Sequence, residues 1–132
     1  MPSNYTFNAS MSCSASSATG YSQSQTGSFN LNLTQINSVQ SGRMEIGTGN
    51  TEVCAAPAGT GINGKIVYIR NLDKVNHLEV HSGTAVDTHV IAILEPEEWF
   101  FTIVRDDAAI GASADTAAID VEYFSVEIDS EA

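Results

Sequence analysis

Basic side chains are scarce in this sequence, and their scarcity excludes one class of partner. Lysine and arginine together number 5, against 16 aspartates and glutamates, which leaves a net charge of −11. Binding to nucleic acid or to an anionic membrane needs clustered Lys and Arg side chains. The basic residues are scattered instead: Arg43, Lys65, Arg70, Lys74 and Arg105. We therefore expect neither nucleic acid nor a membrane among the partners.

Long apolar runs and paired cysteines are missing as well. No stretch approaches the ~20 apolar residues of a membrane-spanning helix. Met1–Asn4 lack the basic and apolar segments of a signal peptide, so we expect none. Cys13 and Cys54 are too few for a disulfide framework, and we expect two buried thiols. With 132 residues and 42% apolar content, the chain fits a single domain spanning residues 1–132.

Helical spacing of apolar residues is also absent, because no window repeats them at i, i+3, i+4 and i+7. Short runs of β-branched and aromatic residues, bounded by turn residues, take their place. They predict an all-β protein, an antiparallel β-sandwich or barrel of about 8–10 short strands. The clearest strand is Lys65–Asn71, which is apolar on both faces and is therefore expected at a central, buried position.

Two local features lead to sharper predictions. Pro96 in Glu95–Glu98 sets the second position of a β-turn, and the non-glycine Glu97 in the third position favours type I geometry. In the last strand the apolar positions change phase between Tyr123 and Phe124. Since a shift of one residue exchanges the faces of a strand, we expect a β-bulge or a bend there.

The first 42 residues contain no charged side chain at all. Ser12–Thr26 is nearly low-complexity and is compatible with a flexible tail, yet alternating apolar residues flank it on both sides. Exposed strands usually carry charges that prevent edge pairing, whereas neutral hydroxyl and amide faces suit burial against a neighbouring subunit. An uncharged exposed sheet is the alternative to this interface. The candidate interface residues are Tyr5, Phe7, Phe29, Leu31 and Leu33.

Two motifs resemble binding sites but fail on geometry. Gly59–Lys65 matches part of a nucleotide-binding glycine loop, but such a loop must lead into a helix and this one leads into a strand. His77, Glu79 and His81 share one face of a strand and form a possible metal triad. The two histidines would lie ~13 Å apart on a flat strand, which is too far for one ion. We expect an ordinary solvent-facing strand with Leu78 and Val80 directed inward.

Other candidate sites are weaker. Clustered acids near Glu95–Glu98 offer a carboxylate pair for glycoside cleavage, although charged turns are normally just solvated. Trp99–Phe101 offers a platform for stacking sugars, although at least one face of this run is expected in the core. We predict that the protein is not an enzyme and uses no metal or cofactor.

Four segments follow one another in the second half of the chain: GKIVYIRNL at Gly64–Leu72, NHLEV at Asn76–Val80, LEPEE at Leu94–Glu98 and ADTAAIDVE at Ala114–Glu122. In their order and residue pattern these segments resemble small virion proteins of tailed bacteriophages. Glu97 departs from the pattern, which favours glycine there. The resemblance covers about half of the chain, and its motifs are structural rather than catalytic.

The resemblance implies a jelly-roll-like sandwich and a structural role in the virion. The expected function is that of a capsid cement or decoration protein that binds the major capsid protein, or other virion subunits, on the capsid surface. Assembly in the host cytoplasm and a homotrimeric state are expected with it. A tail- or fibre-associated domain that binds a host glycan through Tyr21 or Trp99 is the alternative. A small metal-dependent enzyme using the histidine triad is a third hypothesis.

Overall fold

The computed structural model describes residues 7–20, 22–31, 36–55, 62–83, 89–105 and 109–129. Within these ranges the regular secondary structure is entirely β, in agreement with the predicted class, and none of it forms a helix long and apolar enough to cross a membrane. The strands are β1 (Phe7–Ser16), β2 (Ser22–Leu31), β3 (Ile36–Ile46), β4 (Thr51–Cys54), β5 (Ile62–Asn71), β6 (Leu78–Ser82), β7 (His89–Leu94), β8 (Trp99–Arg105), β9 (Ile110–Ala114) and β10 (Ile119–Asp129).

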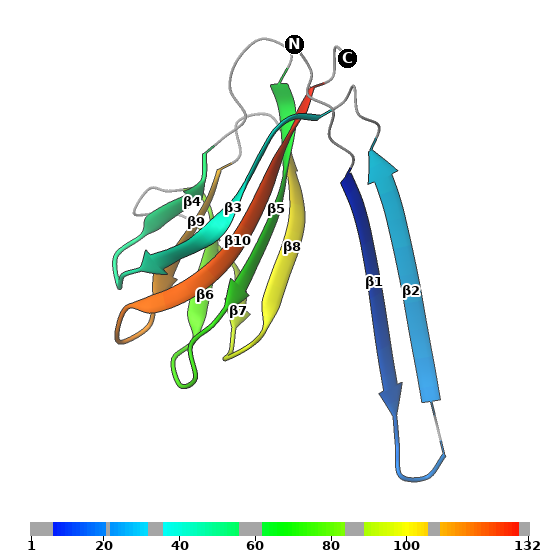
Figure 1. Cartoon of the computed structure of the whole chain (residues 1–132). Coiled ribbons are helices and arrows are strands. Elements are labelled where there is room, and N and C mark those ends of the chain that lie inside the picture. Colours follow the sequence, from blue (N-terminus) through cyan, green and yellow to red (C-terminus); the bar gives the residue numbers. More distant parts are fainter. Residues whose placement is uncertain are drawn as a thin grey trace.

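Strands β3–β10, here called the body, form two four-stranded antiparallel sheets. One sheet has the order β3-β10-β5-β8 and the other has the order β4-β9-β6-β7. The two sheets face each other as layers (Figure 1). Eight antiparallel strands divided in this order between two sheets form a jelly roll. The predicted jelly-roll-like β-sandwich is therefore confirmed.

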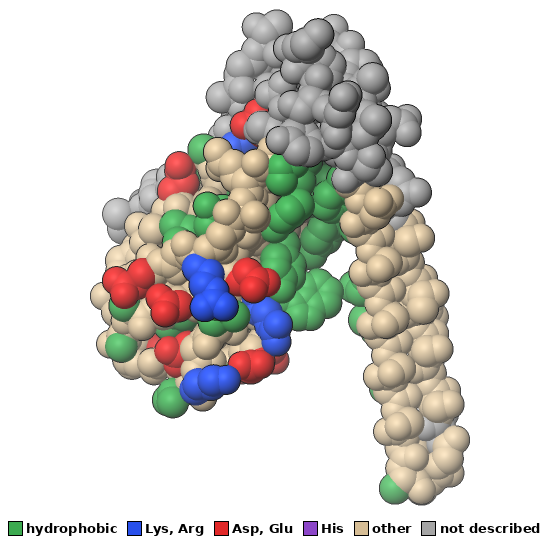
Figure 2. Space-filling view, in the orientation of Figure 1, with side chains coloured by type: hydrophobic (Ala, Val, Ile, Leu, Met, Phe, Trp, Pro, Cys, Tyr) green, Lys and Arg blue, Asp and Glu red, His purple; other side chains and the backbone are tan. Residues whose placement is uncertain are grey.

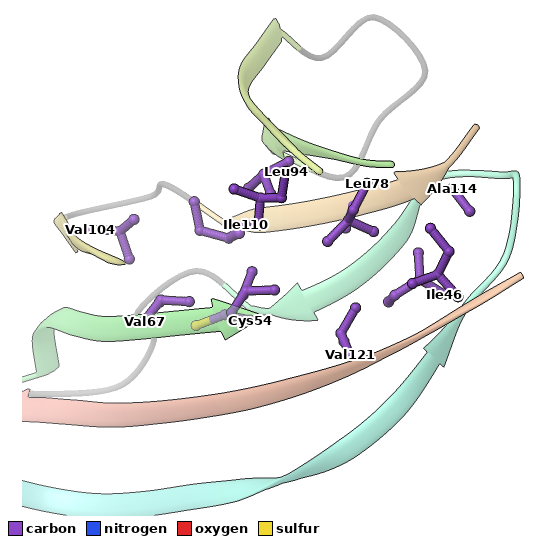
Figure 3. Close-up of a cluster of buried hydrophobic side chains, with 13 residues drawn as sticks. Ile46, Cys54, Val67, Leu78, Leu94, Val104, Ile110, Ala114 and Val121 are labelled. Carbon is purple, nitrogen blue, oxygen red and sulfur yellow. The ribbon is translucent and has the colours of Figure 1, made fainter. Parts of the chain in front are cut away.

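The core of the body lies between the two sheets, where alternate side chains of each strand meet (Figure 3). The buried members of this cluster are Ile46, Cys54, Val67, Ile69, Leu78, Val80, Leu94, Val104, Ile110, Ala112, Ala114, Ile119 and Val121. Strand β5 lies between β10 and β8, as its apolar faces predict. Its Val67 and Ile69 enter this core, whereas Ile66 is buried on the opposite face.

Strands β1 and β2 form a separate two-stranded hairpin, here called the arm. Its antiparallel register runs without interruption from the pair Phe7–Leu31 to the pair Ser16–Ser22. Among the described residues no third strand pairs with it. The arm extends beside the body and diverges from it toward its tip (Figure 1). The Ser-rich stretch that was compatible with a flexible tail therefore consists of strands on both sides of a turn at residues 18–20.

The predicted bulge at Tyr123–Phe124 is wrong. Pairing of β10 with β3 and with β5 continues through these residues, and the register first shifts after Glu127 and after Ile128, respectively. The apolar phase changes because this central strand is buried on both faces. Val121 belongs to the core between the sheets, whereas Val126 belongs to a second apolar cluster on the outer face.

Candidate interaction surface: the arm and the aromatic groove

The outer face of the β3-β10-β5-β8 sheet is graded from apolar to charged. Backbone pairing across β10, β5 and β8 aligns its side chains in three successive rows. The first row is apolar, the second is aromatic and the third carries charges. The rows are Val126–Ile66–Ile103, then Phe124–Tyr68–Phe101, then Glu122–Arg70–Trp99.

The base of the arm covers the apolar end of this face. Phe7 is buried and stacks on Phe124, with the ring centroids 6.0 Å apart and the ring planes inclined by 28°. Buried Phe7, Ile66, Val126 and Ile128 form the second apolar cluster, against which Ala9, Val39, Phe101 and Phe124 pack. The start of β1 is thus fixed to the body through side-chain packing rather than through sheet pairing.

Beyond Ala9 the arm leaves the sheet, and an open groove separates the two. The groove has a volume of about 1120 Å³ and is called the aromatic groove below. Hydrophobic side chains of the body face the arm across this gap (Figure 2). Trp99 is 48% exposed, and its ring centroid lies 6.2 Å from that of Tyr68. The groove is lined by Phe7, Asn8, Ala9, Ser10, Met11, Gly27, Ser28, Tyr68, Arg70, Glu97, Trp99, Phe101 and Phe124.

Charged side chains close the far end of the groove, and they bind one another. The Glu97 carboxylate lies 3.3 Å from the Arg70 guanidinium and 3.1 Å from the Lys74 ammonium group. The hydrogen bond and charge of Lys74, together with the charge of Arg70, hold the pKa of Glu97 below its ordinary value. Partial burial and neighbouring Glu122 raise the pKa of Tyr68. The groove therefore offers an aromatic floor and one charged end, at which the single Glu97 carboxylate is paired with two cations.

The turn that carries Glu97 differs from the predicted type I turn. Glu97 has φ of 75°, the left-handed value required at the third position of a type II turn, and Glu98 N–H donates to the Glu95 carbonyl at 3.0 Å. Left-handed geometry is costly for a residue with a Cβ atom. Arg70 offsets that cost, because its Nε donates to the Glu97 carbonyl at 3.2 Å while its other end binds the carboxylate. Glu97 N–H also donates to the Asn71 carbonyl.

Toward its tip the arm is exposed to solvent. All described side chains at residues 10–20 and 22–28 are exposed, including Met11 at 49%. Cys54 is buried in the core as expected, but Cys13 is exposed. The expectation for Cys13 is wrong because its strand continues past the edge of the body, where no second layer covers it. Burial raises the pKa of the Cys54 thiol, with Lys65 opposing the shift.

The predicted interface residues fall in three groups. Tyr5 and Leu33 lie outside the described residues, as does Tyr21. In the backbone register Leu31 pairs with Phe7 and Phe29 pairs with Ala9. Phe7 packs on its own body. The role of these residues between subunits stays a prediction.

The aromatic groove beside these residues was not predicted from the sequence. The signal that could have revealed it is the alternation in Trp99–Phe101, which directs Phe100 into the core and its two neighbours outward.

The candidate metal triad is not formed: Glu79 and His81 lie in β6, whereas His77 lies just before it. Leu78 and Val80 point into the core as predicted. His77 pairs with Asp115 at 3.3 Å, whereas His81 is buried rather than solvent-facing and its Nε2 lies 2.9 Å from Ser113 Oγ. Across the described part of the chain, no three His, Cys, Asp or Glu side chains are placed to share a metal ion. Gly64 and Lys65 lie within β5 rather than before a helix, and the rest of the glycine loop up to residue 61 lies outside the described residues.

Comparison with known proteins identifies no family for this chain. No family model matches the sequence, and no curated protein matches it. One solved structure with a similar fold is described as "Bacillus endospore appendages form a novel family of disulfide-linked pili". The identity to that protein is 9%, the match covers 72% of this chain and 88% of that chain, and the TM-score is 0.49. At this level the likeness carries no inference about function.

Proposed function

We propose that this chain is a structural subunit of a larger assembly, specifically a capsid cement or decoration protein of a tailed bacteriophage. It binds the major capsid shell, or other virion subunits, as a homotrimer on the capsid surface. The observation that carries the proposal is the arm, a two-stranded ribbon whose described residues beyond Ala9 have no layer of the body over them. An isolated two-stranded hairpin is at best marginally stable in water, so a partner surface is needed to hold it.

The chemistry of the arm supports burial against another subunit. It lies within the 42 residues that contain no charge, so its exposed face consists of hydroxyl, amide and small apolar groups. Covering such groups costs far less free energy than covering charges. The resemblance of the segments within Gly64–Glu122 to virion proteins supports the bacteriophage setting. Apolar area buried in the contact contributes ~25 cal/mol per Å², less the cost of association.

Locating the chain in an image reconstruction of native particles tests this function. The expected result is many copies on the outer shell, each with its arm against a neighbouring subunit. A chain that occurs as a free monomer and belongs to no particle would overturn the proposal.

Binding of purified protein to shells that lack it gives a second test. Ser28→Lys places a charge on the polar face of the arm and is expected to weaken binding about tenfold or more. Thr48→Lys, in an exposed loop of the body, adds the same charge away from the arm and should leave binding unchanged. Equal binding of both variants would exclude the arm as the attachment surface.

Glycan binding by a tail- or fibre-associated domain is the second candidate, and the aromatic groove favours it. Half-exposed Trp99 beside Tyr68 presents aromatic surface next to the donors of Arg70 and the carboxylate of Glu97. Such sites combine an apolar platform with few polar groups. A thermal shift caused by host surface polysaccharide, and lost in Trp99→Ala, would support this candidate over the first.

A further inference from the structure

The aromatic groove has two apolar walls that meet at the base of the arm, where Phe7 stacks on Phe124, and that diverge beyond Ala9. Phe7, Ala9 and Met11 of the arm line one side, and the aromatic residues of β5, β8 and β10 line the other. Met11 of the arm is 49% exposed and Trp99 of the body is 48% exposed. Within one chain, therefore, neither wall of the groove fully covers the other. An occupant of the groove would bury apolar surface on both sides at once.

The charges around the groove restrict what that occupant is. Arg70 and Glu97 are the charged residues among those that line the groove, and they bind each other, with Lys74 bound to the same carboxylate. A charged occupant would lose its hydration over the aromatic floor and would have to compete with these existing ion pairs for a partner. The groove therefore favours an extended, uncharged segment with apolar side chains.

The arm of a second copy has these properties. It is an extended ribbon from a segment without charged residues, and it carries partly apolar, exposed side chains such as Met11. Two copies with a net charge of −11 each repel one another, and every acidic residue lies at or beyond Glu45. The arm is the part of a copy that enters a neighbour's groove without bringing an acid with it. A basic partner, by contrast, would be recognised through the acidic body and not through this neutral segment.

We propose that the aromatic groove of one copy binds the β1–β2 arm of a second copy, and that this arm exchange holds the oligomer together. The inference deepens the proposed structural role and rests on it. Exchange from each copy to the next closes a ring, which satisfies every arm and every groove. The ribbon then gains the layer that it lacks in the isolated chain.

Sedimentation equilibrium of the purified full-length protein, in the absence of any particle, tests the exchange through charge complementation. Met11→Lys on the arm and Trp99→Glu in the groove are each expected to weaken self-association about tenfold or more, because each buries an uncompensated charge. Mixing the two variants should restore association, since the new lysine and glutamate then face each other across the contact. Thr48→Lys is the matched control and should associate like the wild type. Circular dichroism verifies that each variant is folded.

Three outcomes would overturn the exchange. If the wild type forms oligomers that neither variant weakens, the contact between subunits lies elsewhere on the body. If the mixture fails to associate although both variants are folded, Met11 of the arm and Trp99 of the groove do not contact each other between copies. A monomer in which Cys13 becomes protected from thiol reagents would show that the arm closes onto its own groove. If such a monomer still binds particles through Ser28 of the arm, the exchange fails while the proposed function stands.

Discussion

The arm and the body are both made of antiparallel strands, yet different forces hold them. The body closes two sheets over a continuous apolar core in which Ile46, Ile69 and Val121 are fully buried. The arm satisfies backbone hydrogen bonds between its own two strands, but its described side chains at residues 10–20 and 22–28 are exposed. Hydrogen bonds alone give a small net stabilisation in water, because the unfolded chain bonds to water instead. The body is therefore a folded unit, whereas the arm is stabilised chiefly by what it contacts.

This difference explains the distribution of charge. Acidic and basic residues are confined to the part of the chain that supplies the body, where outward-facing charges keep the surface hydrated. The arm has no charge to discourage edge-to-edge pairing, which is a liability in a monomer and an advantage in an assembly. Most of the predictions below compare a change in the body with a change in the arm or at its groove.

The largest expected difference follows from removing apolar side chains. Ile69→Ala empties a fully buried position in the core and should lower the free energy of unfolding by about 2–5 kcal/mol. Met11→Ala, at an exposed position of the arm, should change it by less than about 0.5 kcal/mol. Urea denaturation followed by circular dichroism measures both. A comparable loss for Met11→Ala would mean that the arm belongs to the folding unit of the body.

The two cysteines report the same contrast through their reactivity. Cys13 is exposed on the arm, whereas Cys54 is buried in the core and has a raised pKa. Since the thiolate is the reactive form, Cys13 should react at least about a hundredfold faster with a disulfide reagent at neutral pH in the dilute monomer. The Cys13→Ser and Cys54→Ala variants assign each kinetic phase. Equal rates in the native protein would contradict the described burial.

A buried polar side chain should show a smaller effect than the core. Asn71 is fully buried, and its amide donates to the carbonyls of Asn76 at 2.9 Å and Leu94 at 3.0 Å, while its side-chain oxygen accepts from the Asp73 N–H at 2.8 Å. Asn71→Ala leaves these backbone groups without their partner and should cost about 1–3 kcal/mol. Asn8→Ala, at an exposed arm position, serves as the control and should be nearly neutral. Thermal unfolding of both variants checks the difference.

The smallest effect is expected at the turn beside the groove. Glu97→Gly and Glu97→Ala both remove the contacts with Arg70 and Lys74, but glycine also accommodates the left-handed backbone. The glycine variant should therefore melt at a higher temperature than the alanine variant. The reverse order would show that the φ value at this position is not maintained in solution.

The same turn predicts a dependence on pH. Glu97 has an ordinary pKa of 4.5 that is lowered in the folded protein, so the unfolded chain takes up the proton first as the pH falls. Its stabilisation is present above pH 4.5 and is lost as the pH falls through the lowered value. Glu97→Gly should flatten this part of the stability profile, whereas Glu52→Gln, on exposed residue 52 of β4, should not. Thermal melts between neutral and acidic pH provide the measurement.

The sequence predicts a strand and its position where the apolar residues along that strand alone determine which of its faces are buried. Alternation identified Lys65–Asn71 as a central strand because both of its faces are apolar and both are buried. The Ser-rich arm was ambiguous because hydroxyl side chains carry no periodic apolar signal, and strand pairing there depends on the partner strand. The left-handed backbone of Glu97 could not be predicted, because Arg70 and Lys74, which are distant in sequence, hold this residue in a conformation that its own residue type disfavours.

The aromatic groove lay beyond sequence reasoning for a related reason. Tyr68, Trp99 and Phe124 come from three strands that are far apart in the chain, and only the β10-β5-β8 order aligns them in adjacent rows. A sequence pattern shows that a strand has two apolar faces, but not which of them a second layer covers. The phase change in β10 was therefore interpreted as a bulge when it reflects burial on both sides.

Hydrogen exchange of the arm is the most direct test of the central claim that the arm depends on a partner. Peptides covering β1 and β2 would be followed by mass spectrometry in the dilute monomer and in the native assembly, with peptides of β5 as the internal reference. We expect the arm amides to exchange rapidly in the monomer and to become protected on assembly, while the protection of β5 stays the same. Arm amides that are as strongly protected in the dilute monomer as in the assembly would contradict the claim.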